Sequence, residues 1–258
     1  MGGMQRLAAY IRYLSLVALA AIAAGCASVP AWQDCSRASC WQGSNASTRH
    51  MNILSPHFAD AVFQDRVKWA KARGCNTVHL FLVNQHDGEG SGYSALDPAT
   101  AKVMDKRIKW VRSQGMAVVL WCMADDSSAW AKSLDMEALM KVCESHGWLG
   151  LASTIVVGLE VDEYWSSSQV AAHIATIRRH YKGKVGVHMT SGKTSYAGLA
   201  DILFYQVSPG KSASQIASET KRALACGKPV NFFELDRHEN RSLSEAALAA
   251  GAFGVGNW

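Results

Sequence analysis

Several short motifs that mark large enzyme classes are absent from this chain of 258 residues. It has no Cys-x-x-Cys pair, which counts against a structural zinc site, and no Gly-x-Ser-x-Gly, which counts against a serine hydrolase of the α/β type. No Gly-x-Gly-x-x-Gly follows the first predicted strand, so nothing indicates a dinucleotide-binding fold. Gly192-Lys193-Thr194 resembles the end of a phosphate-binding loop, but Val187 stands where that loop needs its first glycine. We therefore expect no cofactor.

A concentrated charge is also missing. The net charge is +5 at neutral pH, without a block of basic residues, so we expect no nucleic-acid partner. A metal-dependent barrel hydrolase would need His-x-His after its first strand, where this chain has Ser55-Pro56-His57. His57, Asp125 and His188 could still meet in space as ligands, but no metal-type spacing supports that alternative. We expect no metal.

The first 25 residues have the order of charge and hydropathy of a signal peptide. Arg6 and Arg12 precede an apolar run from Leu14 to Ala24, which is too short to span a bilayer. Residues 22–26 resemble a bacterial lipobox, in which the cysteine is lipidated and becomes the new N-terminus. We predict an exported protein that is anchored in the cell envelope by a lipid at Cys26. Simple secretion, a periplasmic location and an uncleaved anchor are the alternatives.

The remaining six cysteines fall into two groups. Cys35 and Cys40 flank a short polar loop, where an oxidising compartment would favour a disulfide. The other four lie in apolar or helical contexts, which are typical of buried thiols: Cys75, Cys122, Cys143 and Cys226.

From residue 50 onward, short apolar runs alternate with amphipathic stretches, which is the pattern of a βα series. We predict strands at 51–54, 77–83, 116–123, 154–161, 184–189, 202–207, 230–235 and 252–256. The predicted helices cover 58–73, 98–113, 136–146, 168–181, 212–226 and 243–250, with a turn at 196–200 and Asp97 as a helix cap. Eight strands predict an α/β fold with a single (β/α)8 barrel domain at 50–258, after a tether or loop at 26–49. A doubly wound open sheet is the alternative.

Polar side chains gather where the predicted strands end, and barrel enzymes carry their active sites at that end. Alternation along residues 155–161 puts Glu160 among the positions that face the barrel interior. Glu234 ends the seventh strand on the face of Val230 and Phe232. A buried carboxylate is costly unless it is paired, so two such acids indicate either a functional site or ion pairs with buried cations.

Two carboxylates on different strand ends have the chemistry for glycoside hydrolysis. One protonates the leaving oxygen while the other attacks or assists at the anomeric carbon. Aromatic neighbours suit stacking on sugar rings, although lids of the core are their alternative role. The residues predicted to bind the substrate share positions at strand ends: Asn84, Trp121, Asp125, Trp165, His188, Tyr205 and Trp258.

In this ordering the chain resembles the large clan of retaining glycoside hydrolases, which have an acid/base Glu after strand 4 and a nucleophile Glu after strand 7. Residues 157–163 and 231–234 carry the resemblance, together with an aromatic residue after strand 6 and a Trp at the end of strand 8. It implies glycosidase activity on a glycan or polysaccharide, with Glu234 as the nucleophile.

The acid/base stays open between Glu160 and Glu163. The strand register favours Glu160, whereas Asp162-Glu163 is closer to the Asn-Glu pair that is usual in the clan. A non-catalytic barrel that binds a glycan, or that forms part of an envelope or particle surface, is the alternative function, because a fold alone does not determine activity.

Overall fold

The computed structural model describes residues 32–34, 59–72, 75–84, 92–124, 133–190, 195–207, 210–235 and 241–256. The chain divides into two units, Met1–Ala31 and Trp32–Trp258, and all described residues belong to the second. The predicted signal peptide, Cys26, the predicted strand at 51–54, Asp125 and Trp258 lie outside the described residues.

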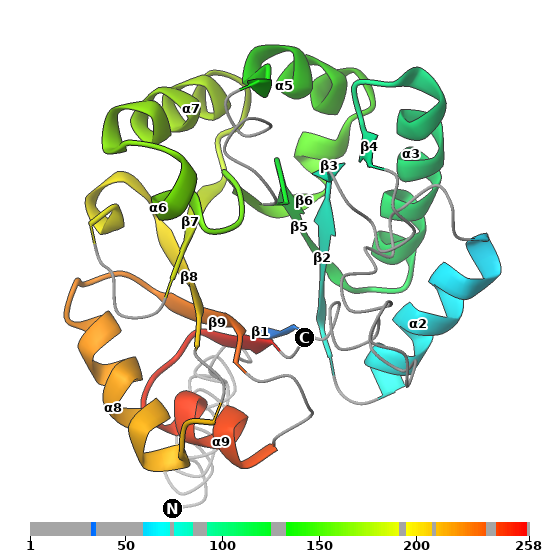
Figure 1. The fold of residues 1–258 in the computed structure, drawn as a ribbon. Helices are drawn as coiled ribbons and strands as arrows, with labels where there is room; N and C mark the ends of the chain where they lie inside the picture. The colour runs from blue at the N-terminus through cyan, green and yellow to red at the C-terminus, as the bar shows by residue number, and fades with distance from the viewer. Residues whose placement is uncertain are drawn as a thin grey trace, which may run out of the picture. The chain divides into compact units, whose positions relative to one another are not determined.

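The second unit is built around a curled sheet of parallel strands with helices on its outer side (Figure 1). Seven strands form its continuous part, in the spatial order β10-β9-β8-β7-β6-β5-β2. An eighth, β1, joins both ends of this order: it pairs with β10 along its length and with β2 only at Asp34 and Thr77. The bounds are β1 (Trp32–Asp34), β2 (Thr77–Phe81), β5 (Ala117–Trp121), β6 (Ala152–Val156), β7 (Lys184–Met189), β8 (Ile202–Gln206), β9 (Val230–Glu234) and β10 (Gly254–Gly256).

This curled parallel sheet agrees with the α/β prediction, but the strand beside β2 is not the expected one. The structure places Trp32–Asp34 there, inside the stretch that the sequence predicted to be a tether or loop. Three residues are too few for an alternating pattern to be visible in a sequence. The join between β1 and β2 depends on a single residue pair, so it is the weakest seam of the sheet.

The helices follow the amphipathic stretches closely, and their caps explain where they begin. Asp97 accepts hydrogen bonds from the backbone N–H groups of Ala99 and Thr100 at the start of α3, as predicted. Ser166 and Ser212 form capping boxes at the starts of α7 and α8. The helices are α2 (Asp60–Ala72), α3 (Pro98–Ser113), α5 (Met136–Ser145), α6 (Val161–Tyr164), α7 (Ser167–His180), α8 (Ala213–Leu224) and α9 (Arg241–Ala249), with 3-10 turns η3 (Trp148–Gly150) and η4 (Ala197–Leu199).

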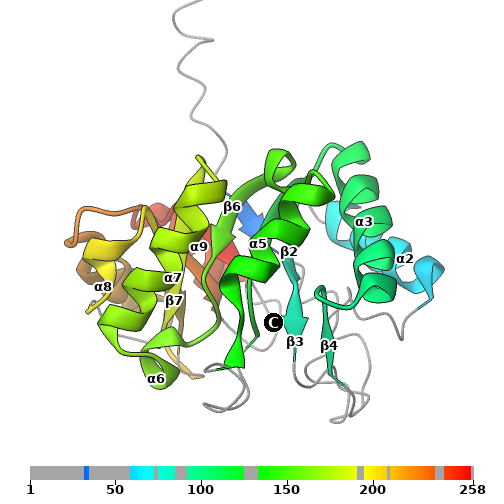
Figure 2. The ribbon, with the colours of Figure 1, turned by 90° about the horizontal axis from the view of Figure 1, so that it is seen from above.

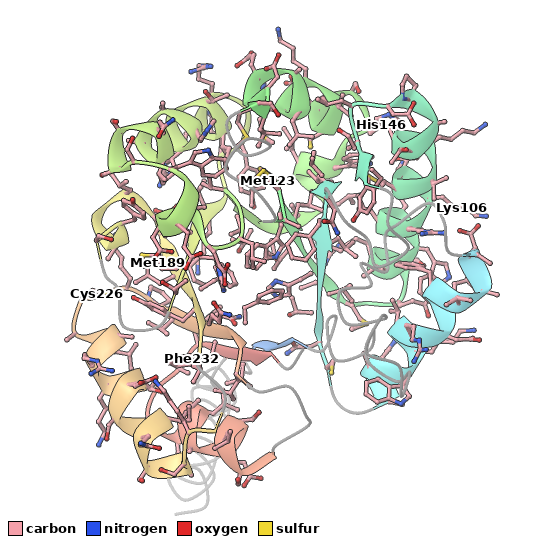
Figure 3. The ribbon with its side chains drawn as sticks, viewed as in Figure 1. Lys106, Met123, His146, Met189, Cys226 and Phe232 are labelled. Carbon is pink, nitrogen blue, oxygen red and sulfur yellow. The ribbon has the colours of Figure 1, made fainter. Side chains whose placement is uncertain are left out.

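Two hydrophobic clusters separate the two faces of the sheet. The larger cluster lies between the strands and the helices and includes Phe232, whereas Lys106 lies on the outer surface of α3 (Figure 3). The smaller cluster takes alternate strand residues, as side chains on the opposite face should. Trp121 of β5 contacts Phe204 of β8, a strand that is not its neighbour, with ring centroids 5.4 Å apart. This cluster therefore fills the interior of the curled sheet.

Two predicted strands end earlier than expected. The run 77–83 breaks at Leu82, after which β3 (Val83–Asn84) pairs with β4 (Tyr93–Ser94) in antiparallel fashion. The run 154–161 ends at Val156, and α6 begins at Val161. The prediction that strand register points Glu160 into the interior is therefore wrong, because Glu160 follows the strand in a left-handed conformation that no strand residue adopts. None of the helices in the described ranges is long and apolar enough to cross a membrane.

Candidate active site

The connection between β6 and α6 carries the most unusual backbone in the described part of the chain. Glu160 has φ 45° and ψ 42°, and it is the one non-glycine residue with positive φ among the described residues. A left-handed conformation costs an ordinary residue about 1–2 kcal/mol. The backbone N–H of Glu160 donates a hydrogen bond of 2.9 Å to Nδ1 of His188 on β7. A contact from a neighbouring strand thus helps to hold the strained residue in place.

Asp162 makes a second connection to the same strand end. One carboxylate oxygen accepts the backbone N–H of Thr190 at 3.0 Å, and the other accepts its hydroxyl at 2.7 Å. Thr190 follows β7 directly. Because both oxygens of Asp162 are engaged, this residue serves the backbone of the site rather than offering an open carboxylate.

Glu163 differs from Glu160 in its surroundings. It lies within α6, its side chain is exposed, and its backbone N–H donates to the carbonyl oxygen of Glu160 at 2.9 Å. Glu160 is half-buried. Figure 2 shows α6 at the same end of the sheet as β3 and β4, which is where β2 and β6 end. Both acids predicted as the acid/base are therefore at the carboxyl end of the strands.

Beneath the turn lies a group of buried rings. The indole N–H of Trp121 donates to Nδ1 of His79 at 2.7 Å, and the Trp121 ring lies 5.5 Å from the His188 ring, edge to face. Phe233 of β9 contacts all three rings. A ring nitrogen that accepts a hydrogen bond carries no proton, so His79 and His188 each have their Nδ1 deprotonated in this arrangement.

The predicted nucleophile, Glu234, is the last residue of β9. The pairing of β8 with β9 shifts between Phe204 and Gln206, so that Glu234 is in register with Gln206. By alternation, Gln206 continues the inward-facing series of Ile202 and Phe204. The predicted shared face of Glu234 with Val230 and Phe232 stays a prediction, because the register of β9 shifts before Glu234. Such β-bulges are over-represented beside active sites.

The remaining predicted substrate-binding residues are mostly buried. Trp165 is 3% exposed and packs on the turn before Glu160, because a Cβ on Gly158 would lie 3.2 Å from its ring. Tyr205 is 2% exposed and packs on Phe232, and burial raises the pKa of its hydroxyl well above the ordinary value. Asn84 is 4% exposed at the end of β3.

The structure thus brings some of the predicted residues together and shows others that sequence reasoning missed. Glu160, His188 and Trp121 form one connected group, and Trp165 borders the same turn. His79 and Thr190 were missed. His79 is the single ionisable residue in the apolar run 77–83, which is a signal that the sequence did contain.

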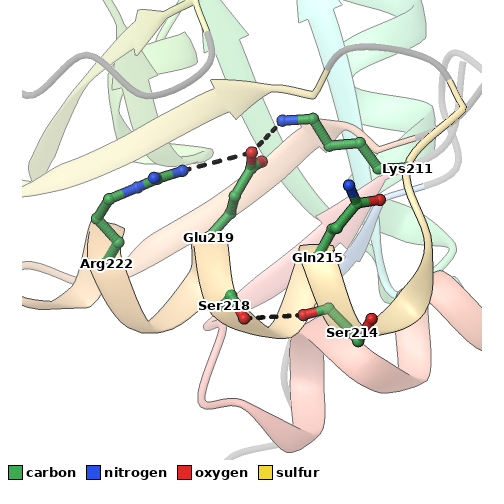
Figure 4. Close-up of a pocket in the computed structure, with 6 residues that line it drawn as sticks. All are labelled: Lys211, Ser214, Gln215, Ser218, Glu219 and Arg222. Carbon is green, nitrogen blue, oxygen red and sulfur yellow. Dashed lines mark hydrogen bonds and ion pairs between the residues drawn. The ribbon is translucent and has the colours of Figure 1, made fainter.

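Two further observations concern metal ligands and a hollow away from these strand ends. Within the described ranges, no group of three or more His, Cys, Asp or Glu side chains could hold a metal ion. A shallow hollow of about 380 Å³ on α8 is lined by polar residues, and Glu219 at its centre pairs with Lys211 and Arg222 (Figure 4). Glu219 is thus paired with one cation just before α8 and one within it, and none of the lining residues follows a strand end directly.

Comparisons with known proteins identify the class of fold. No protein-family model matches the chain, and no curated protein matches it. Among solved structures it is similar to a GH113 β-1,4-mannanase complex, with a TM-score of 0.57 and 14% identity over 81% of this chain and 84% of that one. It is also similar to a GH113 β-mannanase of Alicyclobacillus acidocaldarius, with a TM-score of 0.55 and 16% identity over 81% of this chain and 82% of that one.

A third similar structure is an exo-β-1,4-mannosidase from Opitutaceae bacterium strain TAV5, with a TM-score of 0.58 and 14% identity. That match covers 80% of this chain and 49% of the mannosidase. The chain therefore has an α/β fold of the TIM-barrel type that these glycosidases share. At such low identities the likeness concerns the fold alone.

Proposed function

We propose that this chain is a glycoside hydrolase that cleaves or remodels a glycan with two carboxylates, on a (β/α)8 barrel closed by β1. The observation that carries the proposal is the left-handed Glu160 at the carboxyl end of β6. Strained residues persist only when their surroundings fix them, and they cluster at active sites. The strand ends of a parallel barrel are where such enzymes carry their catalytic groups.

Glu160 is the preferred acid/base, and Glu163 is the alternative. A group that transfers a proton must keep its position relative to the substrate. Glu160 is half-buried and tied through its backbone to His188, whereas Glu163 is exposed to solvent. The proposed nucleophile is Glu234, which lies at the end of β9 beside the register shift.

The buried aromatic residues support the site from below in this proposal. Trp121 is fully buried, gives its indole N–H to His79 and packs on His188, so it supports the site and is not a stacking platform. Asp125 and Trp258 remain proposed substrate contacts, whereas the other predicted binding residues are at most 4% exposed and support the site from within the fold: Asn84, Trp165, His188 and Tyr205.

Activity on aryl β-glycosides tests the proposal. We would begin with β-mannosides, because the similar structures include a β-1,4-mannanase and an exo-β-1,4-mannosidase. Glu160→Ala should lower turnover of methylumbelliferyl glycosides at least 100-fold, since general acid–base catalysis contributes about 10²–10⁴. Glu163→Ala is the matched control and should retain most activity. The reverse order of the two variants would assign the acid/base to Glu163.

A non-catalytic glycan-binding barrel is the second candidate. It is favoured by Asp162, which stands where the clan usually has Asn before the acid/base Glu and whose two carboxylate oxygens both accept from Thr190. Calorimetric titration with mannan and other soluble polysaccharides, combined with product analysis, separates the two functions. Binding without any released sugar would support the second candidate and reject the first.

We also propose that the protein is exported and anchored in the envelope through a lipid at Cys26. The support comes from the order of Arg6, Arg12, an apolar run and a small-residue segment before this cysteine. Cys75 is disulfide-bonded, which corrects the prediction of a free thiol and suits an oxidising compartment. Metabolic labelling with a radioactive fatty acid should mark the wild type and not Cys26→Ser. Labelling of both would reject the anchor.

A further inference from the structure

Three hydrogen bonds join the turn that carries Glu160 to the end of β7. The backbone N–H of Glu160 binds Nδ1 of His188 at 2.9 Å. The carboxylate of Asp162 binds both the backbone N–H and the hydroxyl of Thr190, at 3.0 and 2.7 Å. We call Asp162, His188 and Thr190 the α6–β7 bridge. It connects two neighbouring strand ends through side chains from both sides.

Local structure in α6 does not account for the position of Glu160. The helix has four residues, and the side chain of Glu160 makes no capping hydrogen bond to it. An acidic residue in the first turn of a helix ordinarily stabilises the helix terminus, and both oxygens of Asp162 also reach Thr190 beyond the helix. Hydrogen bonds to a charged acceptor are roughly twice as strong as neutral ones. The contact across the strands is therefore a strong restraint on this turn.

The bridge is fixed at its other end by the interior of the sheet. His188 is fully buried, and its ring lies 5.5 Å from Trp121 and 5.9 Å from Phe233. Trp121 is held in turn by its hydrogen bond to His79 on β2. The backbone of Glu160 is thus connected through side chains to three strands of the parallel sheet, β7, β5 and β2.

We propose that the α6–β7 bridge positions Glu160 for proton transfer, with Asp162, His188 and Thr190 as positioning residues. This inference rests on the proposed function, in which Glu160 is the acid/base. It also assigns a structural task to Asp162, whose engaged carboxylate takes no part in the reaction. A catalytic group displaced by about 1 Å loses on the order of 100-fold in rate, so loosening the bridge should impair the step in which Glu160 gives its proton.

The test compares two threonine-to-valine variants, because this substitution removes a hydroxyl and changes the side-chain volume little. Thr190→Val removes the hydroxyl that contacts Asp162, and Thr190→Ser keeps it. Thr220→Val is the control, because the Thr220 hydroxyl is buried on α8 and bonds the carbonyl of Ile216 at 2.8 Å. Each is assayed on a methylumbelliferyl β-glycoside, whose leaving group benefits from protonation, and on the 2,4-dinitrophenyl β-glycoside, whose leaving group does not.

Thr190→Val should lower kcat/KM for the methylumbelliferyl substrate about tenfold and for the dinitrophenyl substrate less than twofold. Thr190→Ser should restore the wild-type ratio, and Thr220→Val should keep it. Asp162→Asn, which retains an acceptor oxygen for the backbone N–H of Thr190, should show the same selective loss and serves if Thr190→Val does not fold.

The outcomes separate the two proposals. If the wild type cleaves the substrates but Thr190→Val and Asp162→Asn lower both rates equally, or neither, the positioning inference is wrong and the glycosidase proposal stands. If the wild type cleaves no aryl glycoside in the panel, the proposed function fails and the inference fails with it. A selective loss in the bridge variants, absent from Thr220→Val, supports both.

Discussion

The backbone N–H of Glu160 donates to Nδ1 of His188 across 2.9 Å, and this contact links the end of β6 to the end of β7. The interaction requires His188 to have an unprotonated Nδ1, since a protonated ring nitrogen cannot accept a hydrogen bond. The residue with the most strained backbone in the described part of the chain is thereby joined to a fully buried imidazole. The hydrogen bond that stabilises the strained backbone of Glu160 therefore also fixes the position of the candidate acid/base.

Replacing Glu160 by glycine should remove activity without the usual loss of stability. Glycine adopts positive φ without steric cost, whereas alanine does not. Glu160→Gly should therefore be more stable than Glu160→Ala, by about 1 kcal/mol in urea unfolding. Position 163 is the control, because Glu163 is helical and glycine in a helix is less stable than alanine by about 1 kcal/mol. The same order of stability at both positions would contradict the left-handed assignment at Glu160.

The sequence predicted most of the fold because its periodicity depends on burial. The strand at 184–189 and the helix at 98–113 were predicted with the observed bounds, and both have buried faces that repeat with the expected period. The short β1 at Trp32–Asp34 was missed, since three residues show no period. The end of β6 at Val156 was missed because the next residues are apolar as well.

The candidate site was harder to predict, because its contacts join residues that are far apart in the chain. Glu160 and His188 are 28 positions apart, as are Asp162 and Thr190. Sequence spacing showed which acids follow strands, but not that Asp162 would bind Thr190. The left-handed backbone of Glu160 was also invisible, since positive φ is signalled by glycine and asparagine far more often than by glutamate.

Glu234→Gln should abolish turnover of every substrate that the wild type cleaves. A nucleophile acts directly on the anomeric carbon, so its loss affects good and poor leaving groups alike. The acid/base variant Glu160→Ala is the contrasting case. On dinitrophenyl glycosides it should keep kcat/KM, which reports the first step, whereas kcat should fall because water attack on the glycosyl-enzyme lacks its general base. Added azide should then raise kcat and give a glycosyl azide of retained configuration. Product analysis by nuclear magnetic resonance checks this. Full activity of Glu234→Gln would contradict the assignment of Glu234 as the nucleophile.

The free cysteines in the described ranges should differ in reactivity by burial. Burial, with Cys143 nearby, raises the pKa of the Cys122 thiol well above its usual value, and burial raises the pKa of Cys143 to about 12. Because the thiolate is the reactive form, iodoacetamide at pH 8 should modify the half-buried Cys226 in the native protein and leave the other two intact.

Peptide mapping by mass spectrometry before and after unfolding in urea measures this difference. Cys226→Ser should remove the modification that occurs in the native state, and unfolding should make Cys122 and Cys143 react. Cys75 should react only after reduction, because it is disulfide-bonded. Modification of native Cys122 at the rate of Cys226 would contradict the burial of Cys122.

The stability provided by Asp201 should disappear in acid. Burial raises the pKa of its carboxyl, but the hydrogen bonds from the Val185 N–H and from Arg178 outweigh burial, so the net pKa is lowered. A carboxyl whose folded pKa is below its unfolded value, near 3.9, stabilises the fold above that pH. This contribution is lost as the pH falls through the folded pKa, because the unfolded chain then binds the proton more readily.

Asp201→Asn should accordingly lower the free energy of unfolding at pH 7 by about 1 kcal/mol, the low end for hydrogen bonds to a charged group, because the carboxylate is partly exposed. The difference between the variant and the wild type should begin to shrink as the pH falls below about 4, where the unfolded carboxyl takes up its proton, and it should vanish once the pH is below the folded pKa as well. Asp65→Asn is the control, because Asp65 is 79% exposed and lies 4.0 Å from Lys68; it should change stability little at any pH. Urea unfolding at pH 7, 5 and 3 measures the free energy of unfolding of each protein. If the loss of stability in Asp201→Asn were as large at pH 3 as at pH 7, the Asp201 carboxylate would not join Val185 of β7 to Arg178 of α7.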